Sequence, residues 1–235
     1  MINTQSFLEL PFSFDIEKLK DDLYIVEEDE WMPHPNTLAY DGIWEVSSLT
    51  STDGDTKNII AIENENYIAT PLLNKTKYIQ SVIDTFKTKV EAVRFMKLGA
   101  FSSIKEHCDK GSCFEDGYAR LHIPIISNDN VEFILSGKNY KMDLGRCYYI
   151  DAHNIHSVVN KGNNDRIHLL IDCQVNDWLK DFFLKKGFEE PKYKYGEKSI
   201  TDDNVEQIIE SFKTIGTDVS LEMANKLQKI KMKKS

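Results

Sequence analysis

The sequence predicts a mainly β protein with flanking helices, built as an antiparallel sandwich or jelly roll. Short runs rich in β-branched and aromatic residues follow one another between about residues 90 and 173, and clusters of turn-forming residues separate them. Helical periodicity is present before this stretch and returns after it. The runs recur at roughly 8 to 14 residue spacing, which favours antiparallel pairing over a βαβ sheet with crossover helices.

The expected elements form a single domain, 1–235, made of three stretches. A mixed N-terminal segment, 1–75, contains a helix over 15–26, and a jelly-roll core, 76–175, begins with a second helix over 77–86. A helical segment, 176–235, closes the chain and is expected to buttress the barrel or to form a homodimer contact. The strands of the core are predicted at 90–98, 118–126, 131–135, 147–150 and 166–172, and the C-terminal helices at 175–186, 203–215 and 219–232.

Composition excludes several classes of protein. The 38 acidic residues against 29 basic ones give a net charge of −9, which argues against nucleic-acid binding because phosphate contacts need a surplus of Lys and Arg. Charged residues make up 29% of the chain, and neither a membrane-spanning apolar run nor a signal peptide is visible. We therefore expect a cytoplasmic protein with no nucleic-acid or membrane partner.

The four cysteines are expected to be reduced thiols. They form no Cys-x-x-Cys pair, and the chain shows no secretion signal. Cys108 and Cys113 are five positions apart, but a second pair of soft ligands at zinc-finger spacing is missing from the sequence. A structural zinc site is therefore not predicted.

Arginine and histidine gather in the middle of the chain. All four arginines and five of the six histidines lie between residues 94 and 168. Alternation along the predicted strands places Arg120 and His122 on one face, and Arg166 and His168 on one face of a later strand. One interpretation is a sheet face lined with cationic and imidazole groups, and the alternative is a half-exposed sheet whose polar side chains meet water.

His107 and Asp109 are the first candidates for metal ligands. Two side chains at i and i+2 of an extended segment point the same way, so an imidazole nitrogen and a carboxylate oxygen can bind one ion. A third ligand from a distant strand would complete the set. The candidates for it are His156, His153, His122 and His168, and the turn position of His153 favours exposure.

The order of these motifs resembles a known family. His-Cys-Asp at 107–109, Arg-x-His at 120–122, a glycine-led strand at 145, His156 with Asn160, and Arg166 ten residues after that histidine follow one another along the chain. This order is similar to that of the aspartyl/asparaginyl β-hydroxylase family of Fe(II)- and 2-oxoglutarate-dependent oxygenases, which includes bacterial free-proline hydroxylases. The resemblance covers about residues 90 to 180. It implies a double-stranded β-helix, which is a cupin-like jelly roll.

The resemblance also implies roles for individual residues. His107, Asp109 and His156 would hold Fe(II) as a full facial triad. Arg166 would pair with the distal carboxylate of 2-oxoglutarate, and Arg120 with His122 would contact its other carboxylate. The implied reaction consumes O2, hydroxylates a C–H of an amino acid, free or peptidyl, and releases succinate and CO2. Arginine suits this dianion because its planar fork matches a carboxylate.

Substrate-binding candidates are Lys97, Arg94, Trp44 and His168. Lys97 and Arg94 have opposite parity, so a regular strand directs at most one of them into the site. Two other functions stay open at this stage: a non-catalytic cupin-like protein that binds a small dicarboxylate, and a metal dioxygenase or isomerase that needs no 2-oxoglutarate. The roles of Cys108 and Arg146 are not assigned from the sequence.

Overall fold

The chain forms two compact units. The computed structural model describes residues 6–109, 113–188, 193–197 and 199–232. One unit, the barrel unit, spans residues 3–189, and the other, the helical unit, spans residues 190–235 with residues 1–2. The sequence predicted one domain over the whole chain, but the last two helices bury their apolar faces in a separate small core. Each unit is described by itself.

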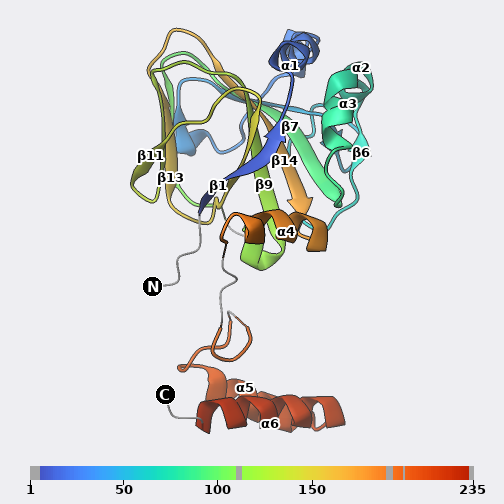
Figure 1. The fold of residues 1–235 in the computed structure, drawn as a ribbon, viewed down its shortest axis with the longest axis vertical. Helices are drawn as coiled ribbons and strands as arrows, with labels where there is room; N and C mark the ends of the chain where they lie inside the picture. The colour runs from blue at the N-terminus through green and yellow to red at the C-terminus, as the bar shows by residue number, and fades with distance from the viewer. Residues whose placement is uncertain (1–5, 110–112, 189–192, 198, 233–235) are drawn as a thin grey trace. The chain divides into compact units, whose positions relative to one another are not determined.

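The barrel unit is a jelly roll of two antiparallel sheets (Figure 1). The 7-stranded sheet, which we call the major sheet, has the order β1 (Phe7–Ser13), β12 (Arg146–Ile150), β9 (Tyr118–Ile126), β14 (Arg166–Gln174), β7 (Val90–Leu98), β4 (Trp44–Ser48) and β2 (Met32–Pro33). The 5-stranded minor sheet has the order β11 (Lys138–Tyr140), β10 (Val131–Leu135), β13 (His156–Asn160), β8 (Ser102–His107) and β3 (Tyr40–Asp41). The predicted fold class is confirmed.

The N-terminal segment contributes more to the sheets than the sequence predicted. It supplies β1 at one edge of the major sheet, β4 and β2 at the other, and β3 at an edge of the minor sheet. The remaining short elements are β5 (Thr50–Ser51) paired with β6 (Ile68–Ala69), and the 3-10 turns η1 (Glu28–Glu30), η2 (Thr37–Ala39) and η3 (Phe114–Asp116). β2 and β3, with two residues each, are too short to show alternation before their partners are known.

Helices cover the outer face of the major sheet. They are α1 (Ile16–Leu23), α2 (Pro71–Lys75), α3 (Lys77–Ile83) and α4 (Asp177–Lys185), and each buries apolar residues in the largest core cluster. The odd-numbered residues of β14, Ile167, Leu169 and Ile171, lie in that cluster. Their even-numbered neighbours therefore point between the two sheets, as the strand alternation predicted.

A smaller core lies between the sheets. It combines Trp44, Leu98 and Ile150 from the major sheet with Ile104, Phe133 and Val158 from the minor sheet. These apolar residues form the walls around the polar side chains described below.

The helical unit consists of α5 (Val205–Ile215) and α6 (Asp218–Met232). Val205 and Ile209 of α5 pack with Ala224 and Leu227 of α6. Gly216 follows α5 with φ +70°, a left-handed conformation that ends the helix and lets the chain reverse. In the described part of the chain, no helix is long and apolar enough to cross a membrane.

Candidate metal centre and cavity

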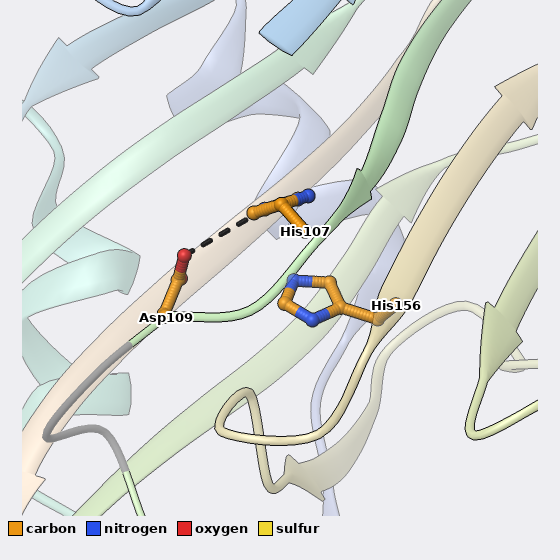
Figure 2. Close-up of side chains that lie close together, drawn as sticks. All are labelled: His107, Asp109 and His156. Carbon is orange, nitrogen blue, oxygen red and sulfur yellow. Dashed lines mark ion pairs between the residues drawn. The ribbon is translucent and has the colours of Figure 1, made fainter.

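Pairing of two minor-sheet strands brings two histidines together. β13 and β8 are antiparallel, and His156 lies opposite His107 in their register. Their ring centroids are 4.2 Å apart. Asp109 follows β8 and turns its carboxylate toward them, so that one ligand atom from each residue lies within 4.8 Å of the others (Figure 2). The structure thus brings together the three residues predicted as the triad.

The backbone fixes the orientation of both imidazoles. His107 Nδ1 lies 2.8 Å from the carbonyl oxygen of Lys105, and His156 Nδ1 lies 2.9 Å from that of Asn154. A carbonyl accepts only from an N–H, so each Nδ1 carries the proton and each Nε2 keeps its lone pair for a metal. Burial lowers the pKa of His156, which favours the neutral, metal-binding form.

Asp109 takes part in a network of ion pairs with two arginines and a second aspartate. Arg120 Nη1 lies 2.5 Å from Asp109 Oδ2, and Arg120 Nε lies 2.7 Å from Asp172 Oδ1. Asp172 also accepts a hydrogen bond of 2.6 Å from Nη2 of Arg94. We call Arg94, Asp172, Arg120 and Asp109 the ionic network. It joins three adjacent strands of the major sheet to the segment that follows β8.

Charge compensation dominates this network. Burial disfavours the ionised form of Asp172, but Arg120 and Arg94 outweigh burial and lower the pKa of its carboxyl group. Burial likewise opposes the charge on Arg120, yet Asp172 and Asp109 outweigh it and raise the pKa of the guanidinium group. Each charge in the network therefore has an opposite charge in contact.

Arg166 lies in a different environment. Its side chain is buried, and no ion pair joins it to a carboxylate among the residues that the structure describes. Its Nη2 donates to His168 Nδ1 across 3.1 Å, and burial lowers its pKa to about 10. A buried guanidinium without a counter-charge is a good site for an anionic ligand.

One cavity of about 330 Å³ connects the triad to these cations. It is lined by most of the predicted site residues, namely His107, Asp109, His156, Arg120, His122, Arg166, Arg94 and Trp44. Apolar side chains such as Met96, Phe133 and Val158 complete the wall. The volume and the mixed lining suit a small polar metabolite.

Two substrate candidates lie outside this cavity lining. Lys97 is opposite Ile167 in the register of β7 and β14, so it shares the outer face of the major sheet, where its Nζ lies 2.6 Å from Glu45 Oε2. Arg94, with the opposite parity, lines the cavity. His168 accepts a hydrogen bond from Arg166 and is 2% exposed. His153 is exposed in the turn after β12, as predicted.

Two carboxylates, those of Asp109 and Asp172, already occupy Arg120, which was predicted to contact 2-oxoglutarate. Three of its nitrogens already contact carboxylate oxygens of Asp109 and Asp172. His122, its partner in that prediction, has a buried Nδ1 with no hydrogen-bond partner among the described residues. Burial and then Arg166 hold the pKa of His122 well below its usual value, so the ring is neutral. His122 is the freer of the two to meet a ligand.

Two residues of the site were not singled out from the sequence. Asp172 shares the parity of Arg166 and His168 on β14, and that signal was available. His34 stacks on Trp44 at 3.5 Å between ring centroids and lines the cavity. Burial and the nearby Arg94 lower its pKa to about 4. Lying between two prolines far from the other histidines, His34 gave no sequence signal.

Comparison with known proteins agrees with the family that the sequence motifs resemble. Residues 14–175 match the sequence model of the aspartyl/asparaginyl β-hydroxylase family, well beyond the stretch that carried the resemblance. The L-proline cis-4-hydroxylase of Rhizobium meliloti (strain 1021) is 25% identical over 203 residues, which cover 83% of this chain and 71% of that protein. A 2OG-Fe(II) oxygenase-family oxidoreductase from Burkholderia pseudomallei superposes with a TM-score of 0.52 at 15% identity, covering 73% of this chain and 86% of that one, which supports the fold.

Proposed function

Because the chain belongs to the aspartyl/asparaginyl β-hydroxylase family and is thereby a dioxygenase of the hydroxylase type, we propose that it oxidises a free amino acid with Fe(II), O2 and 2-oxoglutarate. One observation carries the proposal: the ligand atoms of His107, Asp109 and His156 share a cavity with the uncompensated Arg166. A metal site and an anion site in one small cavity are what a metal-chelating dicarboxylate requires.

The donor set fits Fe(II). Two neutral imidazoles and one carboxylate form the 2-His-1-carboxylate triad of non-haem Fe(II) oxygenases, which leaves positions open for other ligands. The bound iron and 2-oxoglutarate would supply the oxidising power: one oxygen atom of O2 enters the substrate C–H bond, and the other enters succinate as CO2 leaves. Arg120 would hold the Asp109 carboxylate in its ligating orientation.

Arg166 is proposed to bind the distal carboxylate of 2-oxoglutarate. The ligand would supply the negative charge that this guanidinium lacks among the described residues. His168 accepts one of its N–H groups and so keeps the fork pointed in one direction. His122 lines the same cavity as Arg166 and the triad and is proposed to contact the carboxylate next to the keto group.

The substrate proposed is a small amino acid related to proline, bound through its carboxylate by Arg94. Arg94 Nη2 contacts Asp172, while its buried Nε has no hydrogen-bond partner among the described residues. Trp44 and His34 form a flat apolar wall at the same cavity, against which a ring or an aliphatic chain can pack. The relative that hydroxylates L-proline supports this substrate class.

The test is a succinate-release assay over free amino acids and short peptides, with a product mass shift of one oxygen. We expect L-proline or a related free amino acid to give the highest turnover, and His107→Ala or His156→Ala to abolish succinate formation. Wild-type turnover in either variant would contradict the proposal. Oxygen uptake without 2-oxoglutarate would instead support the metal dioxygenase or isomerase.

The substrate contact has a matched control on the same strand. Arg94→Met should raise the KM for the amino acid by about 100-fold, because a charge-assisted carboxylate contact contributes roughly 2 to 3 kcal/mol. Lys97→Met, on the opposite face of β7, should leave that KM unchanged. Equal effects of the two substitutions would show that Arg94 does not bind the substrate carboxylate. A cytoplasmic location and a homodimer stay predictions.

A further inference from the structure

A second group of potential metal ligands lies outside the cavity. Cys113, Asp116 and His153 each offer one ligand atom, and these atoms lie within 4.8 Å of one another. Cys113 directly precedes η3, Asp116 ends η3, and His153 belongs to the turn between β12 and β13. Spacing along the chain does not join these residues, since His153 is 37 positions beyond Asp116.

Both segments that carry the three residues are held in place. The amide of Phe114 donates to the hydroxyl of Tyr149 across 2.9 Å, and the Phe114 ring stacks on Phe183 of α4. In the facing turn, the amide of His153 donates to Asp151 Oδ1 across 3.1 Å. The ligand atoms are therefore carried by two anchored backbone segments. This anchoring lowers the entropic cost of ordering the ligands when a metal binds.

The geometry allows an ion to enter. Cys113 is buried, whereas Asp116 and His153 are exposed, so the group is closed on the protein side and open to solvent on the other. Cys113 Sγ already donates to Asp116 Oδ2 across 3.1 Å, which is close to the spacing of two ligands on one small cation. An open side also leaves room for a water molecule as a fourth ligand.

The donor types select the kind of ion. A thiolate, an imidazole and a carboxylate together match zinc, which binds sulfur, nitrogen and oxygen donors in tetrahedral sites. They do not match Mg²⁺ or Ca²⁺, which prefer oxygen donors alone. We propose that Cys113, Asp116 and His153 form a second divalent-metal site of the zinc type, separate from the triad of His107, Asp109 and His156.

Metal binding would replace the hydrogen bond between Cys113 and Asp116. The Cys113 S–H proton, now donated to Asp116, leaves to solvent as the sulfur–metal bond forms, and the Asp116 carboxylate turns from acceptor to ligand. The metal would tie the chain after Asp109 to the chain before His156. These segments already meet through the hydrogen bond from the Asp109 amide to the Ala152 carbonyl, 2.8 Å long. The proposed role is to stabilise the two segments that present triad ligands.

Cobalt(II) titration of the reduced full-length chain tests the site. The triad contains no sulfur, so only the second site can give a thiolate-to-cobalt charge-transfer band in the near ultraviolet. We expect two equivalents of Co(II) to bind, with this band accompanying one of them. Cys113→Ser should remove the band and one equivalent, and Cys108→Ser, an exposed thiol next to the triad, should keep both.

Two further variants separate this proposal from failure to fold and from the proposed function. His153→Ala changes an exposed residue, so the fold should persist, as circular dichroism would show, while Co(II) binds the second site at least tenfold more weakly. His107→Ala should remove the triad equivalent and keep the thiolate band. A wild-type chain that binds one equivalent without the band, or a band that persists in Cys113→Ser, would overturn the second site.

Discussion

Arg120 and Arg166 both line the same cavity, but only Arg120 has its charge compensated by carboxylates. Arg120 contacts the carboxylates of Asp109 and Asp172. Arg166 has a histidine as its side-chain partner and no carboxylate among the described residues. A buried charge that the protein neutralises can hold other groups in place, whereas one left unneutralised lowers stability and favours an anionic ligand. Under the proposed function, the difference would assign Arg120 to positioning Asp109 and Arg166 to binding the cosubstrate.

The largest effect is expected from removing the carboxylate of Asp172, which Arg94 and Arg120 share. Asp172→Asn should leave Arg94 without a carboxylate and Arg120 with Asp109 alone, and we expect the free energy of unfolding to fall by about 3 kcal/mol or more. Urea denaturation of the iron-free protein measures it. Glu132→Gln, which removes an exposed ion pair with Lys161, is the control and should cost less than about 1 kcal/mol. Similar losses in both variants would contradict the compensation of the ionic network.

A second variant removes the uncompensated charge of Arg166. Arg166→Met should weaken 2-oxoglutarate binding by about 100-fold, equal to about 2.7 kcal/mol, because the carboxylate partner is lost. The ligand-free protein should be at least as stable as the wild type, since no ion pair is broken. Anaerobic calorimetric titration with Fe(II) present gives the affinity. Unchanged affinity would show that Arg166 does not bind the cosubstrate.

His168, which accepts a hydrogen bond from Arg166, should make the stability of the fold depend on pH. Burial, then Arg166 and His122, hold the pKa of His168 well below its usual value of 6.5, so the folded state keeps the ring neutral. The unfolded chain takes up a proton below pH 6.5 and the folded state does not, so stability is full above pH 6.5 and falls below it. At pH 5 the loss should be about 2 kcal/mol for this one group.

His168→Gln isolates that contribution, because Gln keeps an acceptor for Arg166 but does not titrate. Chemical denaturation at pH 7.5 and pH 5 should show a smaller loss of stability in the variant than in the wild type. His122, His34 and His156, whose pKa values are also lowered, contribute to the remaining dependence. Identical pH dependence in variant and wild type would mean that His168 is not held neutral.

The smallest effect is expected at Arg146, which the sequence left without a role. It bonds Glu9 across the β1 and β12 pair at 2.6 Å, and both side chains are about 40% exposed. Water screens such a pair, so Arg146→Ala should lower the stability of the fold far less than Asp172→Asn does and should leave 2-oxoglutarate affinity unchanged. Thermal melts and the same titration would check both. A loss like that of Asp172→Asn would remove the distinction between interior and surface arginines.

The faces of the strands were predictable because alternation is local. Arg166 and His168 share one side of β14 while Ile167, Leu169 and Ile171 lie in the outer core, as the pattern indicated. The early and late triad ligands, too, follow from spacing and from the family resemblance. By contrast, β1, β2 and β3 were missed. β2 and β3 have only two residues each and carry no periodic signal of their own.

Contacts between distant segments could not be predicted in the same way. Asp172 compensates Arg120 because β14 and β9 pair in a register that sets them opposite each other. The stacking of His34 on Trp44 and the meeting of His153 with Cys113 likewise depend on where loops cross. A shift of one residue in either strand would reverse these faces, and nothing in the local sequence fixes that choice.

Spacing along the chain predicted an antiparallel sandwich or jelly roll and the side of each strand on which the cations lie, because strand alternation is local. The family resemblance, and not spacing alone, named His156 as the third candidate ligand beside His107 and Asp109. Which arginine is neutralised, which of Arg94 and Lys97 lines the cavity, and that the last two helices form a core of their own became visible in the folded chain. The physical reason is that burial and charge compensation are set by long-range strand pairing.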